Sequence, residues 1–226
     1  MGAGVKNKKA AVWYFSAALI IALALTARVL DRDGPLSQLA CALAASAAIW
    51  RGSALLYGGT HNEKIMKRAV TAIFIIYLVL LINYTIFDGH FGRVAPEGAS
   101  DVPLPEYFRR KGNLIPFKMI RNQTKGLLNG NYALRHYAVN VLGNLAAFAP
   151  LALFLPLLFK KCRKYPVFFA VTTAIILSVE TCQLLLRVGS FDVDDYILNM
   201  AGATVVFLLL SAKKGKRITD GILRPE

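Results

Sequence analysis

The sequence predicts an all-α protein, a polytopic bundle of about six transmembrane helices with an interfacial or re-entrant extracytoplasmic segment. The first observation is composition: 56% of the 226 residues are hydrophobic and 18% are charged, whereas soluble domains carry about 25% charged residues. The second is that the charges stand in short clusters between long apolar runs. Those runs approach the ~20 residues that a helix needs to cross a bilayer.

The spans follow in chain order. Clear apolar runs lie at 10–30, 69–87, 137–159, 166–186 and 195–212. The run at 36–57 is interrupted by Arg51, whose long side chain can reach the membrane surface, so this run is predicted as a further span. The first run is too long for the core of a cleavable signal peptide. The three cysteines are scattered and form neither a disulfide nor a zinc spacing.

Basic residues predict the orientation. With six spans, both termini share one side of the membrane with the short connections near 50–68 and 160–165, and that side carries 16 of the 27 Lys and Arg residues. Basic connections stay in the cytoplasm, so we expect a multi-pass membrane protein with both ends cytoplasmic. The net charge of +14 is then a signal of topology and of attraction to membrane lipids. No nucleic-acid partner is predicted, and protein partners are not indicated.

The segment 88–136 falls on the opposite, extracytoplasmic side. Its later part mixes apolar residues with Lys118, Arg121 and Lys125. This mixture favours a helix lying in the membrane interface or a short re-entrant element.

Polar residues inside apolar runs are the main functional signal, because they are costly in a bilayer. Asn140 and Asn144 stand one turn apart, and Glu180, Gln183 and Arg187 are spaced to share one helix face. Asp192, Asp194, Asp195 and Asn199 open the last span, and all three sets fall in the outer half of the membrane. We therefore predict one polar, water-accessible pocket open to the extracytoplasmic side.

Purely structural roles are the alternative explanation of these polar residues. Asp192 and Asp195 are spaced as the N-cap and third residue of a helix. Glu180 is placed for an ion pair with Arg187, and the two asparagines for hydrogen bonds between helices.

Established enzyme motifs are absent. Glu180, Asp194 and Asp195 are the candidate catalytic groups, as an acid or base. No metal site or cofactor is predicted from the motifs, although these carboxylates are of the type that holds a divalent cation.

Four motifs occur in order: N-L-x-P-F (Asn113, Pro116, Phe117), N-x-x-x-N-x-x-x-F-x-P (Asn140, Asn144, Pro150), E-x-x-Q (Glu180, Gln183) and D-x-D-D-x-x-x-N-x-x-G (Asp192 to Gly202). This series resembles the VanZ-like family of bacterial membrane proteins, whose namesake confers resistance to the glycopeptide antibiotic teicoplanin. The resemblance covers about 69–212. It implies a location in the bacterial cytoplasmic membrane and points to Asn113, Phe117, Asn140, Asn144, Glu180, Gln183, Asp192, Asp194, Asp195 and Asn199. Together with Arg187, which helix spacing adds, these form the predicted ligand-binding set.

The expected organisation is two N-terminal spans at 1–68, the VanZ-like domain at 69–212 and a basic tail at 213–226. The expected function is glycopeptide resistance, through an outer pocket that binds an antibiotic, a lipid or a cell-wall precursor headgroup. The alternative is an intramembrane enzyme that modifies a lipid or a lipid-linked sugar with Glu180 and the aspartates. The residues leave open whether the protein is an enzyme.

Overall fold

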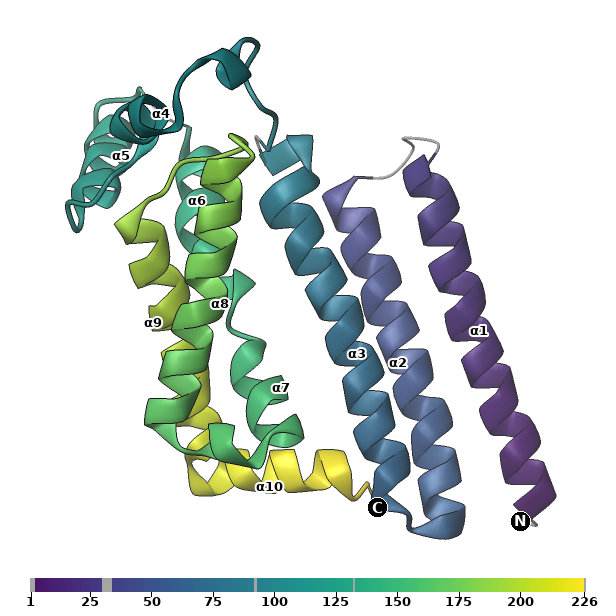
Figure 1. The fold of residues 1–226 in the computed structure, drawn as a ribbon. Helices are drawn as coiled ribbons and strands as arrows, with labels where there is room; N and C mark the ends of the chain where they lie inside the picture. The colour runs from purple at the N-terminus through teal and green to yellow at the C-terminus, as the bar shows by residue number, and fades with distance from the viewer. Residues whose placement is uncertain (1–2, 30–33, 92, 132, 226) are drawn as a thin grey trace. The chain divides into compact units, whose positions relative to one another are not determined.

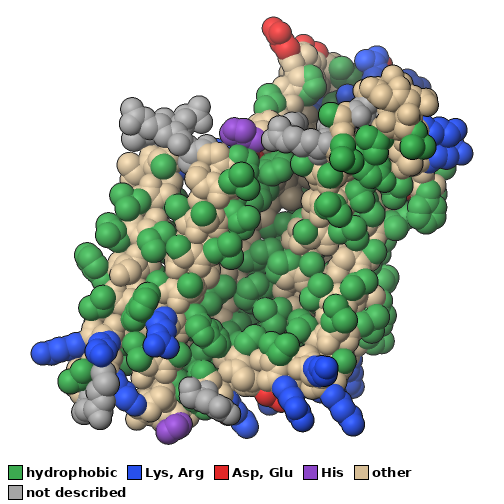
Figure 2. Space-filling model, turned by 180° about the vertical axis from the view of Figure 1, so that it is seen from behind, with side chains coloured by type: hydrophobic (Ala, Val, Ile, Leu, Met, Phe, Trp, Pro, Cys, Tyr) green, Lys and Arg blue, Asp and Glu red, His purple; other side chains and the backbone are tan. Residues whose placement is uncertain are grey.

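The structure is a computed structural model that describes residues 3–29, 34–91, 93–131 and 133–225. Those residues form helices and turns and no strand. The predicted six spans are confirmed, since six helices are long and apolar enough to cross a membrane: Gly4–Arg28, Pro35–Thr60, Glu63–Phe87, Tyr137–Leu158, Tyr165–Leu185 and Val193–Ser211. Apolar side chains cover the lengths of the helices, and Lys and Arg gather near helix ends (Figure 2).

The chain divides into two compact units, 1–81 with 212–226, and 82–211. The first unit contains α1 (Ala3–Val29), α2 (Pro35–Thr60), nearly all of α3 (Glu63–Ile82) and α10 (Lys213–Leu223) (Figure 1). Small residues let α1 and α2 approach closely, because a Cβ added to Gly52 would lie 3.2 Å from the Trp13 Cβ. Tyr14 and Ser53 share a hydrogen bond of 2.7 Å across the same contact.

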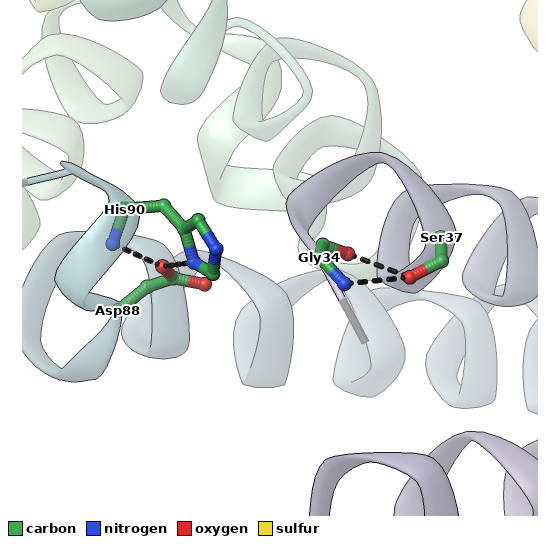
Figure 3. Close-up of polar contacts among 4 residues, drawn as sticks. All are labelled: Gly34, Ser37, Asp88 and His90. Atoms are coloured by element: carbon green, nitrogen blue, oxygen red, sulfur yellow. Dashed lines mark hydrogen bonds and ion pairs between the residues drawn. The ribbon is translucent and has the colours of Figure 1, made fainter. Parts of the chain in front are cut away.

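Local chemistry sets where α2 begins. Pro35 occupies its first position, where a missing N–H costs nothing. The Ser37 hydroxyl accepts the Gly34 N–H at 2.9 Å and donates to the Gly34 carbonyl at 2.7 Å (Figure 3). These bonds satisfy a backbone donor that the helix start would otherwise leave unpaired.

The second unit holds three long helical segments and the elements that join them. A π-helical turn, η1 (Asn83–Phe87), follows α3, and two short 3₁₀ turns, η2 (Gly89–Phe91) and η3 (Ala99–Asp101), come next. Two short helices follow, α4 (Leu104–Lys111) and α5 (Lys118–Leu128), which lie at the upper end of this unit in Figure 1. The remaining elements are α6 (Leu134–Ala147), α7 (Leu151–Leu158), η4 (Lys160–Arg163), α8 (Tyr165–Leu185) and α9 (Val193–Ser211).

Helix α9 packs against α6, α7 and α8 and organises the core of this unit. Phe168 of α8 stacks on Phe207 of α9 with 4.5 Å between ring centroids. At the contact with α6, a Cβ on Gly202 would lie 1.8 Å from the Leu145 carbonyl oxygen. Glycine therefore allows the two backbones to touch at this crossing.

The fourth span, predicted at 137–159 and confirmed as Tyr137–Leu158, contains a break in its helix. It breaks between α6 and α7, where Leu151 donates to the Phe148 carbonyl at 3.1 Å and Ala152 to the Ala149 carbonyl at 3.0 Å. Pro150 has no N–H to continue the α6 ladder, and its ring crowds the preceding turn. Phe148 is only 2% exposed, so the break lies inside the protein, where irregular backbone is tolerated at membrane depth.

The segment predicted as a basic tail is largely helical. Helix α10 follows α9 directly, and the Arg224 Nε donates to Glu63 Oε1 at 2.6 Å. The two residues belong to the same unit.

Candidate functional site: a carboxylate and amide cluster

The start of α9 is built by Asp192. Its Oδ1 accepts the N–H of Asp194 at 2.8 Å, which is the bond of a helix N-cap. The predicted capping role of Asp192 is therefore confirmed. Asp195 occupies the third helical position, but its carboxylate does not return to the Asp192 N–H. That N–H instead donates to Glu180 Oε2 of α8 at 3.4 Å, so a carboxylate from another helix completes the cap.

Hydrogen bonds hold the connection before α5 against this N-cap. Asn113 Nδ2 donates to Asp192 Oδ1 at 2.9 Å. The backbones also pair, since the Asn113 N–H donates to the Phe191 carbonyl at 2.8 Å and the Val193 N–H donates to the Asn113 carbonyl at 2.9 Å. The N-L-x-P-F motif and the aspartate motif thus meet as one short parallel bridge.

Asp194 caps a second helix, α5. Its carboxylate accepts backbone N–H groups from Phe117, from Met119 at 2.7 Å and from Ile120 at 3.1 Å. Phe117 adopts a φ of 61°, a conformation that costs energy for a bulky residue. The Asp194 side chain is fully buried, and these bonds give it a structural task. Its candidacy as a catalytic group stays a prediction.

Glu180 and Asp195 face each other from α8 and α9. They are close enough to interact electrostatically, and Asn144 of α6 donates its amide to Asp195. Glu180 is 4% exposed. Helices α6, α8 and α9 therefore bring Asn144, Glu180 and Asp195 together in one place, here called the cluster. The sequence predicted this convergence, and ligand binding by these residues stays a prediction. Asn140 lies one turn before Asn144 on α6.

Gln183 links α8 to the turn after α3. Its Nε2 donates to the Thr85 carbonyl at 2.7 Å, and its side chain is 2% exposed. Thr85 lies in η1, and a π-helical turn shifts the backbone bonding pattern there. Gln183 is therefore held by the backbone at the edge of the cluster.

Arg187 departs from the predicted arrangement. The spacing places it on the face of Glu180 and Gln183, but α8 ends at Leu185 and Arg187 has a φ of 57°. Its Nη2 donates to the Val102 carbonyl at 2.7 Å, and its guanidinium lies 5.8 Å from the Tyr107 ring centroid. The ion pair weighed for Glu180 and Arg187 is thus replaced by contacts to the 102–107 segment. A role for Arg187 in ligand binding stays a prediction.

Arg93 is a cation beside Glu180 and Asp195 that the sequence prediction missed. Its guanidinium interacts electrostatically with both Glu180 and Asp195. A Cβ on Gly189 would lie 2.8 Å from its Nη1, so the glycine makes room for it. The Arg93 Nε is buried and has no hydrogen-bond partner in the part of the chain that the structure describes.

A tight turn positions Arg93. Asp88 is fully buried, and its Oδ1 accepts the His90 backbone N–H at 2.8 Å and pairs with the His90 Nδ1 at 2.9 Å (Figure 3). The Asp88 carbonyl then accepts the Arg93 N–H at 3.3 Å. The only sequence signal was an arginine within a few residues of a span end, and nothing in the spacing connects it with Glu180.

Asn199 continues the α9 face one turn below Asp195. It is 2% exposed, and its Oδ1 is buried without a hydrogen-bond partner among the described residues. Buried polar atoms are nearly always paired. Asn199 Oδ1 and Arg93 Nε depart from this rule, as Asp88 Oδ2 and Arg187 Nε also do. Phe117, which was also predicted to bind the ligand, is not buried: its side chain is 61% exposed.

The electrostatics of the cap depend on burial. Burial raises the pKa of the Asp192 carboxyl above its ordinary value of 3.8, and the hydrogen bonds from the Asp194 N–H and from Asn113 lower it in part. Over the part of the chain that the structure describes, no three His, Cys, Asp or Glu side chains are arranged to hold a metal ion.

Comparison with protein families adds one finding. The VanZ/LLP1 family matches residues 74–214, which is more than half of the chain. The chain belongs to the VanZ/LLP1 family. The match contains every residue of the cluster, and also Arg93. Comparison with curated proteins and with solved structures gives no match. With its six spans, this VanZ/LLP1 protein is a multi-pass membrane protein.

Proposed function

We propose that this VanZ/LLP1 protein protects a bacterial cell against glycopeptide antibiotics of the teicoplanin type. In this proposal the cluster around Glu180 and Asp195 lines a polar pocket at the extracytoplasmic surface. The pocket binds the headgroup of an antibiotic, a lipid or a lipid-linked cell-wall precursor. Both termini are cytoplasmic, as the distribution of basic residues predicts.

One observation carries the proposal: buried carboxyl and amide groups from α6, α8, α9 and two connections meet at one end of the spans. Burying such groups costs free energy, and in membrane proteins polar groups of this kind usually pair with one another or serve a function. The hydrogen bonds of Asp192 and Asp194 explain those two residues as caps. Capping does not explain the other three residues, because Glu180, Asp195 and Asn199 have carboxyl and amide atoms that the helix starts do not use.

The charges suggest how a ligand would be held. Carboxylate and amide oxygens accept hydrogen bonds from the amine, hydroxyl and peptide N–H groups that glycopeptides and precursor headgroups carry. The Arg93 Nε is a hydrogen-bond donor without a partner among the residues that the structure describes, and guanidinium groups bind carboxylates and phosphates well. The enzymatic alternative stays a prediction.

The test is susceptibility of cells that express the protein. Cells with the wild-type chain should tolerate a lipid-tailed glycopeptide better than cells with Glu180→Gln or Asp195→Asn, at equal amounts of protein in the membrane. Glu97→Gln and Asp101→Asn are matched controls, because these carboxylates are exposed in the 88–103 connection. The controls should behave as wild type. Equal susceptibility of all variants and of cells without the protein would refute the proposal.

A further inference from the structure

Helix α5 carries an exposed cationic face whose lysine and arginine side chains form no hydrogen bond or ion pair with the described residues, although the Lys118 charge also acts on Asp192. Lys118, Arg121 and Lys125 are all exposed, and their spacing of three and four residues places them on one side of the helix. The helix contains no acidic residue. Its exposed face is therefore uniformly positive.

Large apolar side chains stand at both ends of that face. Leu114, Ile115 and Phe117 before the helix are each 61% exposed, and Leu128 at its end is 80% exposed. Basic and apolar side chains gather over the end of the unit that carries α4 and α5, at the upper right of Figure 2. Apolar groups this exposed next to cations are typical of a helix lying on a membrane surface.

The attachments of α5 place it at the level of the membrane surface. Its first turn is capped by Asp194, in the first turn of the span Val193–Ser211. Thr124 donates a hydrogen bond of 3.3 Å to the hydroxyl of Tyr137, the first residue of another span. Because both anchors are span ends, α5 runs where hydrocarbon gives way to headgroups.

We propose that α5 is a lipid-binding helix, whose Lys118, Arg121 and Lys125 bind the phosphates of anionic phospholipids while Leu128 and the 114–117 segment insert among the acyl chains. The charge complementarity selects a lipid surface as the occupant, since an anionic bilayer presents a continuous layer of phosphates to such a face. The proposal rests on the six spans and is independent of the proposed pocket.

The experiment uses the full chain in lipid nanodiscs, with Trp13 and Trp50 replaced by phenylalanine and Leu128→Trp as the reporter. The discs contain phosphatidylcholine alone or with phosphatidylglycerol, and a fraction of the acyl chains carries bromine, which quenches tryptophan. Quenching should be strong and should increase with phosphatidylglycerol. Glu97→Trp, in an exposed connection, is the aqueous control and should be quenched by dissolved iodide instead.

Charge variants then test the phosphates. In the reporter background, Arg121→Gln/Lys125→Gln should weaken the response to phosphatidylglycerol by about 5-fold per charge removed. Lys213→Gln/Lys214→Gln removes the same charge from exposed positions of α10 and should leave the response unchanged. Three results would overturn the proposal: a Leu128→Trp reporter that behaves like Glu97→Trp, one shielded from both bromine and iodide as under a protein partner, or an equal response in both double variants.

Discussion

The backbone of Gly202 in α9 lies directly against the carbonyl of Leu145 in α6, with no room for a side chain between them. This crossing is one residue beyond Asn144, which donates its amide to Asp195. The approach of α6 to α9 therefore determines whether the amide of one helix reaches the carboxyl of the other.

Gly202→Ala should separate the two helices, since its Cβ would lie 1.8 Å from the Leu145 oxygen. Overpacking of this kind costs about 1–3 kcal/mol of unfolding free energy. Gly143→Ala is the matched control, because nothing lies within 4 Å of a Cβ there. The control should be neutral or stabilise α6 by up to about 1 kcal/mol. Thermal unfolding of purified protein in detergent measures both, and equal stability of the two variants would contradict the packing described.

Asp194→Ala should loosen α5 selectively. The variant loses the acceptor for the N–H groups of Phe117, Met119 and Ile120, and loss of a cap costs about 0.5–2 kcal/mol. Hydrogen exchange should become faster at these three amides, while the amides in the middle of α9 remain protected. Asp194→Asn keeps one acceptor oxygen and should have a smaller effect. Unchanged exchange at Met119 in the alanine variant would show that the cap is not needed.

The pH dependence of stability should report on Asp192, whose folded-state pKa is raised by burial. In the unfolded chain this carboxyl ionises near its ordinary pKa of 3.8. As pH rises above that value, the unfolded state ionises first, so the contribution of Asp192 to folding stability falls until pH exceeds the raised pKa. Asp192→Asn lacks this loss and retains an oxygen for the Asn113 and Asp194 donors.

The unfolding midpoint of wild type relative to Asp192→Asn should therefore decrease from about pH 4 upward and then level off. A difference that is constant across this range would mean that the carboxyl keeps its ordinary pKa. Glu97→Gln, at an exposed position, provides the baseline for removing a carboxyl group.

Arg93→Gln should reduce glycopeptide tolerance as much as Glu180→Gln does, because Arg93 is a cation that interacts with Glu180 and Asp195. Gly189→Ala should have the same effect in weaker form, since its methyl group would displace the end of the Arg93 side chain. Inhibitory concentrations at equal expression measure both variants. Full tolerance in Arg93→Gln cells would remove Arg93 from the proposed site and leave the carboxylates to be tested separately.

The spans were predictable because hydropathy depends on composition over about 20 residues and not on fine geometry. The convergence of Glu180, Asp195 and Asn144 was predictable from helix spacing and the alternating direction of spans. Arg93 was not, because its place depends on the turn that buried Asp88 holds together. Arg187 was misplaced because helical spacing was extended past Leu185, where the helix ends. The break before α7 was signalled by Pro150, but an apolar run does not reveal where its helix stops.

Because of the break at 148–150, the rotation of α7 about its axis does not depend on that of α6. In an unbroken helix each inserted residue would turn everything beyond it by about 100°, so the lipid-facing side of one half would dictate the direction of the other. Here the residues between α6 and α7 can take up such a change. The half that ends the span at Leu158 can therefore change in length or lipid contact without changing how Asn144 reaches Asp195.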